Sequence, residues 1–416
     1  MDTNSHVLIY TIKNKKSLNE ILELIQLETD VNKQNHEGQT ALITAASFGC
    51  ENSVSIIRAL IDNGADVDKQ DNTGKTALMF AAEYGKQYGG AIIRELTGAG
   101  ANVNIQEMGG WTALMLAIMY GKEYSYEMMH ALVNAGANVN IQDEDGENAL
   151  TYAAKHESNK ASTMIQELVN MGADPNSETK DGWTALTYAA RWGGANAGAK
   201  IRTLIALGAD PNKQLSNGTT ALMFAVFKDE HAKTTVDALL EYPDIDVNKQ
   251  DNEGYTALIK ATKNANKYMD TIMHLLINAG ADVNKQTTEG FTALMVAARH
   301  GGKYTEKMVR KLISCGAKLP SYKCLNWFAH LCPEKALTTL EYIYGTKNWT
   351  PLHRAADARD SEAISECLSK GYQYDNKVES IYPDMCTPLS IAESSSYPTA
   401  QPIDENCIAL LRPNFN

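Results

Sequence analysis

The chain lacks an excess of basic charge. It carries 38 lysine and arginine residues against 50 aspartate and glutamate residues, which gives a net charge of −12 and a pI of about 5.3. Nucleic-acid binders need a basic surface that displaces counterions from phosphates, and anionic lipid attracts basic clusters of the same kind. The composition therefore argues against a nucleic-acid partner and against docking on a membrane surface.

Long apolar runs and a disulfide pattern are also missing. No run of about 18 apolar residues could span a bilayer, and no charged-then-apolar leader opens the chain, so membrane insertion is not expected. The seven cysteines are odd in number and mostly far apart: Cys50, Cys315, Cys324, Cys332, Cys367, Cys386 and Cys407. This favours free thiols in a reducing compartment, and we expect a cytoplasmic protein.

Motifs for catalysis or metal binding are incomplete. The segment 72–76 is similar to the end of a phosphate-binding loop, but Lys69 stands where that motif needs its first glycine. The acidic run 143–147 places its glycine two residues too early for a calcium loop. Three conceivable zinc ligands do not share a face of their predicted helix: Cys324, His330 and Cys332. We therefore expect no enzymatic activity, no cofactor and no metal.

What the chain does contain is one motif repeated at a fixed spacing. A version of Thr-Ala-Leu-x-x-Ala occurs eight times at intervals of 36 residues, with one polar replacement at its first position. Such a period indicates a solenoid, in which each unit packs on its neighbours and the stack presents a surface for partners. The first residues of these motifs, here called anchors, are Thr40, Thr76, Thr112, Asn148, Thr184, Thr220, Thr256 and Thr292.

Each unit predicts two helices followed by a turn-rich segment. After the anchor, apolar residues recur on one face, and small alanines let this first helix lie close between two others. A second amphipathic helix carries a leucine twenty residues after the anchor, and a Gly-Ala pair is expected to end it with a left-handed cap. A short hairpin, here called the finger, follows, with a glycine two residues before the next anchor.

These units resemble ankyrin repeats. The family motif Thr-Pro-Leu-His-x-Ala is matched in full at residues 350–355, while the main array has alanine in place of proline. The resemblance implies an all-α solenoid of stacked helix-turn-helix units with short β-hairpin fingers. The family's usual period is about 33 residues, and the extra length here lies between the anchor and the glycine of the second helix. We therefore expect about one added turn between or within the helices.

The regularity divides the chain into four segments. Residues 1–34 are predicted to be an N-terminal capping unit, because they have a helical pattern but no Thr-Ala-Leu. Residues 35–320 hold eight regular 36-residue repeats. Residues 321–349 are predicted to be a degenerate repeat that lacks a full finger, and residues 350–416 to be the last repeats and a C-terminal cap, for about eleven units in all.

The resemblance also implies where a partner binds. In the ankyrin fold, the finger tips and the outward side of the first helix line a concave face, which here holds the residue before each anchor and the seventh and eighth residues after it. Four of the five tryptophans occupy these variable positions, as is typical of a binding hot spot. The predicted partner-binding residues are Phe48, Tyr84, Trp111, Tyr120, Trp183, Arg191, Trp192, Tyr255, Phe291, Arg299 and His300.

A single ring could instead fill a groove between adjacent fingers. For the set as a whole, we interpret the surface as a site for a partner protein that offers acidic side chains beside apolar ones. Neither of the two tryptophans in the Thr184 unit belongs to the Ala-Leu-Ala framework, so we expect both to affect binding more than folding.

We therefore expect a monomeric, non-catalytic scaffold for protein–protein interaction. An alternative is the substrate-recognition adaptor of a ubiquitin ligase complex, although the repeats leave no room for an additional helical box. An enzyme fused to repeats is disfavoured because no non-repeat domain remains. Abundant Asn, Lys and Ile hint at an AT-rich genome, and the partner and its cytoplasm would be those of a host if the source is a virus or an intracellular microbe.

Overall fold

The computed structural model describes residues 7–28, 30–227, 230–264, 267–300 and 304–318, and these residues form consecutive pairs of α-helices. The chain divides into two units, residues 1–245 and residues 246–416. The predicted degenerate repeat 321–349 and the predicted last repeats 350–416 lie outside the described residues.

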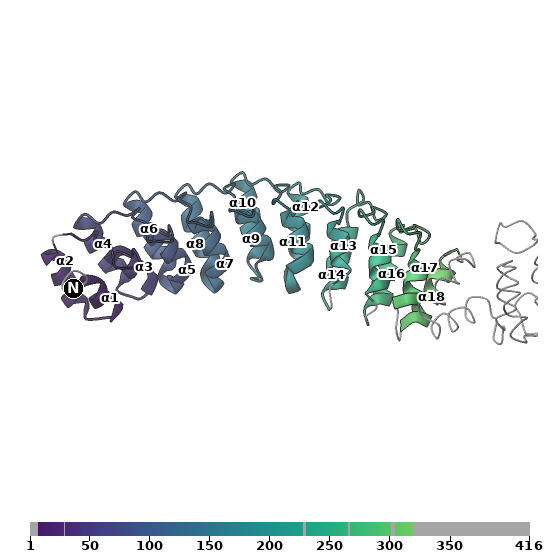
Figure 1. Cartoon of the computed structure of the whole chain (residues 1–416), viewed down its shortest axis with the longest axis horizontal. Coiled ribbons are helices and arrows are strands. Elements are labelled where there is room, and N and C mark those ends of the chain that lie inside the picture. Colours follow the sequence, from purple (N-terminus) through teal and green to yellow (C-terminus); the bar gives the residue numbers. More distant parts are fainter. Residues whose placement is uncertain (1–6, 29, 228–229, 265–266, 301–303, 319–416) are drawn as a thin grey trace, which may run out of the picture. The chain divides into compact units, whose positions relative to one another are not determined.

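In the first unit, the first helices of successive repeats pack side by side in chain order, and the second helices follow in the same order (Figure 1). The N-terminal pair is α1 (Val7–Lys13) and α2 (Leu18–Leu27). The first helices of the repeats are α3 (Ala41–Phe48), α5 (Ala77–Tyr84), α7 (Ala113–Tyr120), α9 (Ala149–Lys155), α11 (Ala185–Trp192) and α13 (Ala221–Ala225). The second helices are α4 (Ser53–Asp62), α6 (Gly89–Gly98), α8 (Ser125–Asn134), α10 (Ala161–Asn170), α12 (Ala197–Ala206) and α14 (Ala232–Leu240).

The second unit continues the same pattern in its described part. Its helices are α15 (Ala257–Lys263), α16 (Met269–Asn278), α17 (Ala293–His300) and α18 (Thr305–Ser314). Helix α15 packs on α16 and α17, and α17 packs on α18. The all-α solenoid that the sequence resemblance implies is therefore confirmed.

The anchors start the first helices by capping them. Thr76 has extended backbone angles, and its side-chain oxygen accepts the N–H of Met79, three residues along. Asn148 does the same for Thr151, whose hydroxyl in turn accepts the N–H of Asn148 in a capping box. Each such cap stabilises its helix by about 1 kcal/mol. The polar replacement at position 148 thus keeps the function of the threonine.

The core of each repeat is the predicted alanine and leucine framework. In the Thr76 repeat, Leu78, Ala81 and Ala82 of the first helix are buried, and so are Ile92 and Leu96 of the second. Small alanines let neighbouring first helices approach closely, while the larger side chains of the second helix fill the space behind them.

The added turn of the 36-residue period lies between the two helices. Three repeats contain a 3₁₀ turn at this point: η1 (Lys86–Tyr88), η2 (Lys122–Tyr124) and η3 (Gly194–Asn196). Each turn leads directly into the second helix, so the three extra residues extend the connection and leave the helix framework unchanged.

The fingers are tight turns with very little strand structure. Residues 214 and 220, and residues 286 and 292, form isolated antiparallel bridges, and the described residues contain no longer strand. In the finger before Thr76, the N–H of Asp71 donates to the carbonyl of Lys75 at 2.9 Å, and the Asp71 carboxylate accepts two further backbone N–H groups. The side chain therefore replaces the ladder that a longer hairpin would form.

Side-chain amides tie each finger to the next repeat. The amide of Asn176 donates to the carbonyl of Gly208 at 2.9 Å, and its oxygen accepts the N–H of Asp210 at 2.7 Å. The amide of Gln142 donates both to Gly146 in its own finger and to Glu178 in the next one. The Asn contact recurs along both units, so it belongs to the framework of the stack and is not special to one repeat.

Candidate functional site

The largest aromatic cluster among the described residues is built around Trp183, the residue before the anchor Thr184. The finger fixes its backbone, because the N–H of Trp183 donates to the Thr179 hydroxyl and its carbonyl accepts the N–H of Thr179. Its ring is half-buried and stacks on Tyr188 at 5.0 Å between centroids and on Phe224 of the next repeat at 4.7 Å. Trp183 therefore joins two neighbouring repeats.

Trp192 is the exposed member of this cluster. Its ring centroid lies 4.8 Å from that of Trp183 and 5.4 Å from that of Tyr188, while 46% of the residue is exposed. The guanidinium of Arg191 lies 5.7 Å from the Trp192 ring and 6.0 Å from the Phe224 ring, and this arginine is exposed as well. The cluster thus presents an indole and a cation to solvent on a support of packed rings.

A second aromatic group surrounds Trp111. Its half-buried ring stacks on Tyr120 of the same repeat at 5.9 Å and contacts Tyr152 of the next repeat at 4.6 Å. Tyr120 is 47% exposed, whereas Tyr152 is buried. As in the first cluster, a half-buried tryptophan supports an exposed ring.

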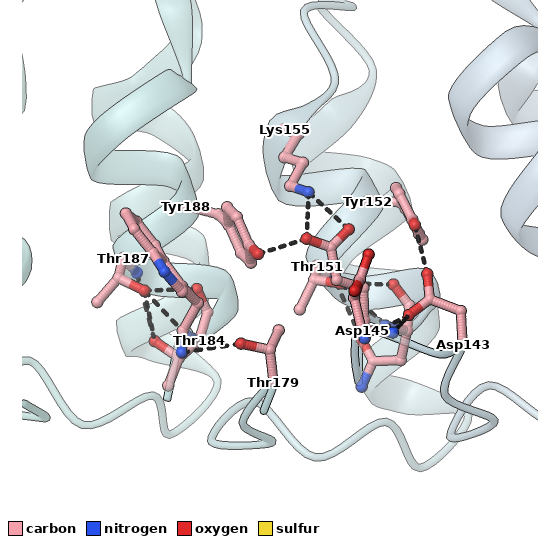
Figure 2. A network of polar contacts seen from close by, with 12 residues as sticks. Asp143, Asp145, Thr151, Tyr152, Lys155, Thr179, Thr184, Thr187 and Tyr188 are labelled. Carbon is pink, nitrogen blue, oxygen red and sulfur yellow. Dashed lines mark hydrogen bonds and ion pairs between the residues drawn. The ribbon is translucent and has the colours of Figure 1, made fainter. Parts of the chain in front are cut away.

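A polar network lies between the two aromatic groups (Figure 2). The ammonium of Lys155 donates to both carboxylate oxygens of Glu147, at 2.5 and 2.6 Å, and the hydroxyl of Tyr188 donates to the same carboxylate. The hydroxyl of Tyr152 donates to Asp143 at 2.5 Å, and only 7% of Asp143 is exposed. Two side chains of the acidic run 143–147 are thus turned inward and hold tyrosines in place.

Burial and these hydrogen bonds change the acidity of the tyrosines. Burial is the main cause that raises the pKa of Tyr152 above its ordinary value, and its hydrogen bond to Asp143 adds to the effect. Burial and the hydrogen bond to Glu147 raise the pKa of Tyr188 in the same direction. Both hydroxyls therefore remain protonated donors at neutral pH.

The other predicted residues lie in smaller groups. Phe48 is half-buried under the ammonium of Lys15, which is 5.7 Å from its ring, and Tyr84 is 47% exposed beside Phe80. In the second unit, Tyr255 is half-buried beneath two lysines of α15, Lys260 and Lys263. Also in that unit, Phe291 and Arg299 are half-buried and His300 is exposed.

The predicted residues therefore differ in exposure. Tyr84, Tyr120, Arg191, Trp192 and His300 are exposed, whereas the half-buried ones are Phe48, Trp111, Trp183, Tyr255, Phe291 and Arg299. The structure joins Trp183, Arg191 and Trp192 in one group, and Trp111 and Tyr120 in another.

The fourth residue after the anchor was not among the predicted site residues. In the structure this position supplies rings to both clusters and to the contact with Tyr84: Phe80, Tyr152, Tyr188 and Phe224. A signal for it exists in the sequence, because this position lies one helical turn before the predicted eighth residue and varies between repeats as that residue does.

The described residues also bear on metal sites and membrane spans. Within the described ranges, no three His, Cys, Asp or Glu side chains gather in a group that could hold a metal ion. The helices described here also include none that is long and apolar enough to cross a membrane. Cys324, His330 and Cys332 lie outside the described residues.

Comparison with known proteins gives one family. The family model described as ankyrin repeats (3 copies) matches residues 8–104, 86–166, 158–251 and 230–323, which overlap to cover the chain from 8 to 323. Among solved structures, a match is the crystal structure of the ankyrin repeat domain of Bcl-3, described as a unique member of the IkappaB protein family. It is 25% identical, covers 56% of this chain and 96% of that one, and has a TM-score of 0.45. No curated protein matches the chain.

Proposed function

Because the chain belongs to the ankyrin-repeat family, we propose that it is a non-catalytic scaffold that binds a partner protein through the aromatic surface of its first helices and fingers. Repeats of this family generally mediate protein–protein interaction, and the family is typically non-enzymatic. The proposal for this chain adds the location: the Trp183 cluster, with Trp192 as its exposed contact residue.

The observation that carries the proposal is that Trp192 is exposed to solvent while its ring packs on Trp183 and Tyr188. Hot spots of protein interfaces are rich in tryptophan, tyrosine and arginine, and here an exposed indole stands beside the exposed Arg191. Stacking on Trp183 and Tyr188 already restricts the ring, so binding loses little additional side-chain entropy. The guanidinium of Arg191 makes no ion pair within the described residues, which suits a partner that offers a carboxylate beside an apolar side chain.

The first test is the Trp192→Ala variant. A partner captured with the wild-type chain and then purified should bind this variant with about 2 kcal/mol less free energy, which is roughly a thirtyfold weaker Kd. Its melting temperature should change little, because the other three rings of the cluster still stack. Met171→Ala, which also removes an exposed apolar side chain, serves as the control and should leave affinity unchanged. A large loss of stability with intact affinity would refute the proposed site.

Trp183→Ala should behave differently from Trp192→Ala, although the sequence alone led us to expect both tryptophans to affect binding more than folding. Its ring packs on Tyr188, Trp192 and Phe224, so removing it opens a cavity between two repeats. We expect the unfolding free energy to fall by about 3 kcal/mol, together with the affinity, because the support of Trp192 is lost. Urea denaturation of both variants distinguishes them, and equal stability of the two would contradict this account.

We also propose a compartment and an assembly state. The odd number of widely spaced cysteines supports a reducing cytoplasm, that of a host if the source is a virus or an intracellular microbe. The stacked repeats bury their cores within one chain, which supports a monomer. Cell fractionation and light scattering test these two proposals.

A further inference from the structure

Two consecutive repeats share a five-residue segment that lies outside the alanine and leucine framework. It reads Tyr-Gly-Lys-Gln-Tyr at residues 84–88 and Tyr-Gly-Lys-Glu-Tyr at residues 120–124. Each copy ends its first helix and forms the turn η1 or η2, and the two turns contact one another. A groove of about 710 Å³ lies here, and its lining includes Glu83, Tyr84, Lys86, Tyr120, Lys122 and Glu123.

The lysine of each copy has a strained backbone. Lys86 has a φ of 49° and Lys122 a φ of 53°, in the left-handed region that costs most residues free energy. In the third turn of this kind, η3, the same position is Gly194 with a φ of 60°, so the turn needs the conformation but not a lysine. Strain of this kind gathers at functional sites. The turn itself therefore does not explain why lysine occupies positions 86 and 122.

Contacts within the described part of the chain do not explain these lysines. Among the described residues, the other non-glycine residue with positive φ is Lys15, whose ammonium lies over the ring of Phe48. By contrast, Lys86 and Lys122 are exposed, and neither makes an ion pair within the described residues. Their ammonium groups are available to a ligand.

The local charge balance of the groove differs from that of the whole chain. Of the two acids that line the groove, Glu83 is already paired with Lys75 at 2.6 Å, so only Glu123 opposes Lys86 and Lys122. The charged side chains that line the groove sum to zero, and counting Lys75 together with its partner Glu83 leaves an excess of one positive charge, on a chain of net charge −12. Two free lysines are few for a nucleic acid, whose binding neutralises many phosphates, but they suit an isolated pair of carboxylates.

Tyrosine rings form the apolar part of the groove. Tyr84 and Tyr120 are each 47% exposed, and Gly49 and Gly121 add no side chain that would fill the space beside them. A hydrogen bond to Glu83 raises the pKa of Tyr84 to about 12, so its hydroxyl is neutral at physiological pH and adds no negative charge. Rings beside free cations are suited to a peptide that carries both acidic and apolar side chains.

We propose that this groove binds an acidic segment of a partner protein, with two carboxylates at Lys86 and Lys122 and an apolar side chain against Tyr84 and Tyr120. This inference rests on the proposed function, because it names the chemistry of a partner. Its location is separate from the Trp183 cluster, so the two sites can be tested independently.

The test is peptide binding by the full chain. Fluorescein-labelled decapeptides that carry two glutamates around a leucine or phenylalanine, with the other positions varied, are titrated with the protein and followed by anisotropy. Matched peptides with glutamine in place of glutamate should bind at least about tenfold more weakly, and added salt should weaken the acidic peptides. If no acidic peptide binds, or a single-stranded oligonucleotide of equal charge binds more tightly, the proposal is overturned.

The decisive variant is Lys86→Gly/Lys122→Gly. Glycine accepts the left-handed backbone without strain, so the melting temperature should not fall, while the affinity for the acidic peptides should drop at least about tenfold. Lys13→Gln/Lys180→Gln removes the same charge from exposed positions elsewhere and should leave the affinity within about twofold. Wild-type affinity in the glycine variant, or an equal loss in the control, would overturn the proposal. Trp192→Ala should bind the peptides normally, so failure here leaves the test of the Trp183 cluster intact.

Discussion

The hydroxyls of Tyr152 and Tyr188 each donate to a carboxylate between the two aromatic clusters. Because of this arrangement, the stability of the fold should fall at alkaline pH. Their folded pKa values are raised above those of the unfolded chain, so above about pH 10 the unfolded state releases protons that the folded state keeps. The stabilisation is fully present below that pH and is lost as the pH rises.

We therefore predict that Tyr152→Phe is less stable than the wild type at pH 7 but loses less stability in base. The neutral-pH cost should be about 1 kcal/mol, because the variant leaves the buried Asp143 without its tyrosine donor. Urea midpoints measured from pH 8 to pH 11 should converge for the two proteins. Parallel curves over this range would show that Tyr152 does not carry the alkaline sensitivity.

Single residues were also where the sequence was least informative. Lys200 occupies a position that is apolar in the other regular repeats, yet it is fully buried and donates to the carbonyls of Ala154 and His156 at 2.8 Å. The repeat pattern predicts burial at this position, but nothing in the pattern predicts that a lysine would donate to carbonyl groups at the C-terminal end of α9. Likewise, the pattern placed Trp183 and Trp192 at variable positions without showing that one supports the other.

At the scale of the helix and turn, local chemistry made the sequence highly predictive. The anchors cap helices because Thr and Asn side chains accept the N–H three residues along, and that requirement is visible in one repeat. The left-handed glycines after the second helices were predicted for the same reason. The placement of the added turn between the helices required the structure, because three residues can be added to a helix or to a loop.

Three Gly→Ala substitutions at the ends of α5 and α6 should distinguish the cost of a steric clash from the cost of a positive φ. At Gly85 an added Cβ would lie 2.5 Å from the Cα of Gly89, so we expect a loss of about 2 kcal/mol or more. At Gly100 there is space, but its φ of 88° should cost about 1 kcal/mol. Gly98 has space and no positive φ, and Ala should stabilise it by about 0.5 kcal/mol. Urea denaturation gives the order, and a stable Gly85→Ala variant would contradict it.

At the scale of the whole molecule, the stack holds together through contacts between successive repeats. In the first unit, an asparagine four residues after the second-helix glycine joins most repeats to the next one, as Asn140 and Asn176 do. In such a system stability is close to a sum of repeat and interface terms, and cooperativity depends on the interfaces. The sequence predicted this stacking from its period, because a repeated unit of two amphipathic helices can bury its apolar face only against its neighbours.

Weakening one interface in the middle of the first unit should therefore reduce cooperativity as well as stability. Asn176→Ala removes the hydrogen bonds to Gly208 and Asp210. Because Asp210 is exposed, its N–H can bind water instead, so we expect the free energy of unfolding to fall by about 1–2 kcal/mol. The urea m value should also fall, because the repeats on the two sides unfold less as one body. Asn134→Ala, whose side chain hydrogen-bonds to His130 in its own helix and to no other group among the described residues, should leave both quantities nearly unchanged. Hydrogen exchange should rise mainly in the repeats that flank residues 176–210, and a uniform rise along the first unit with an unchanged m value would mean that the asparagine contacts do not couple the repeats.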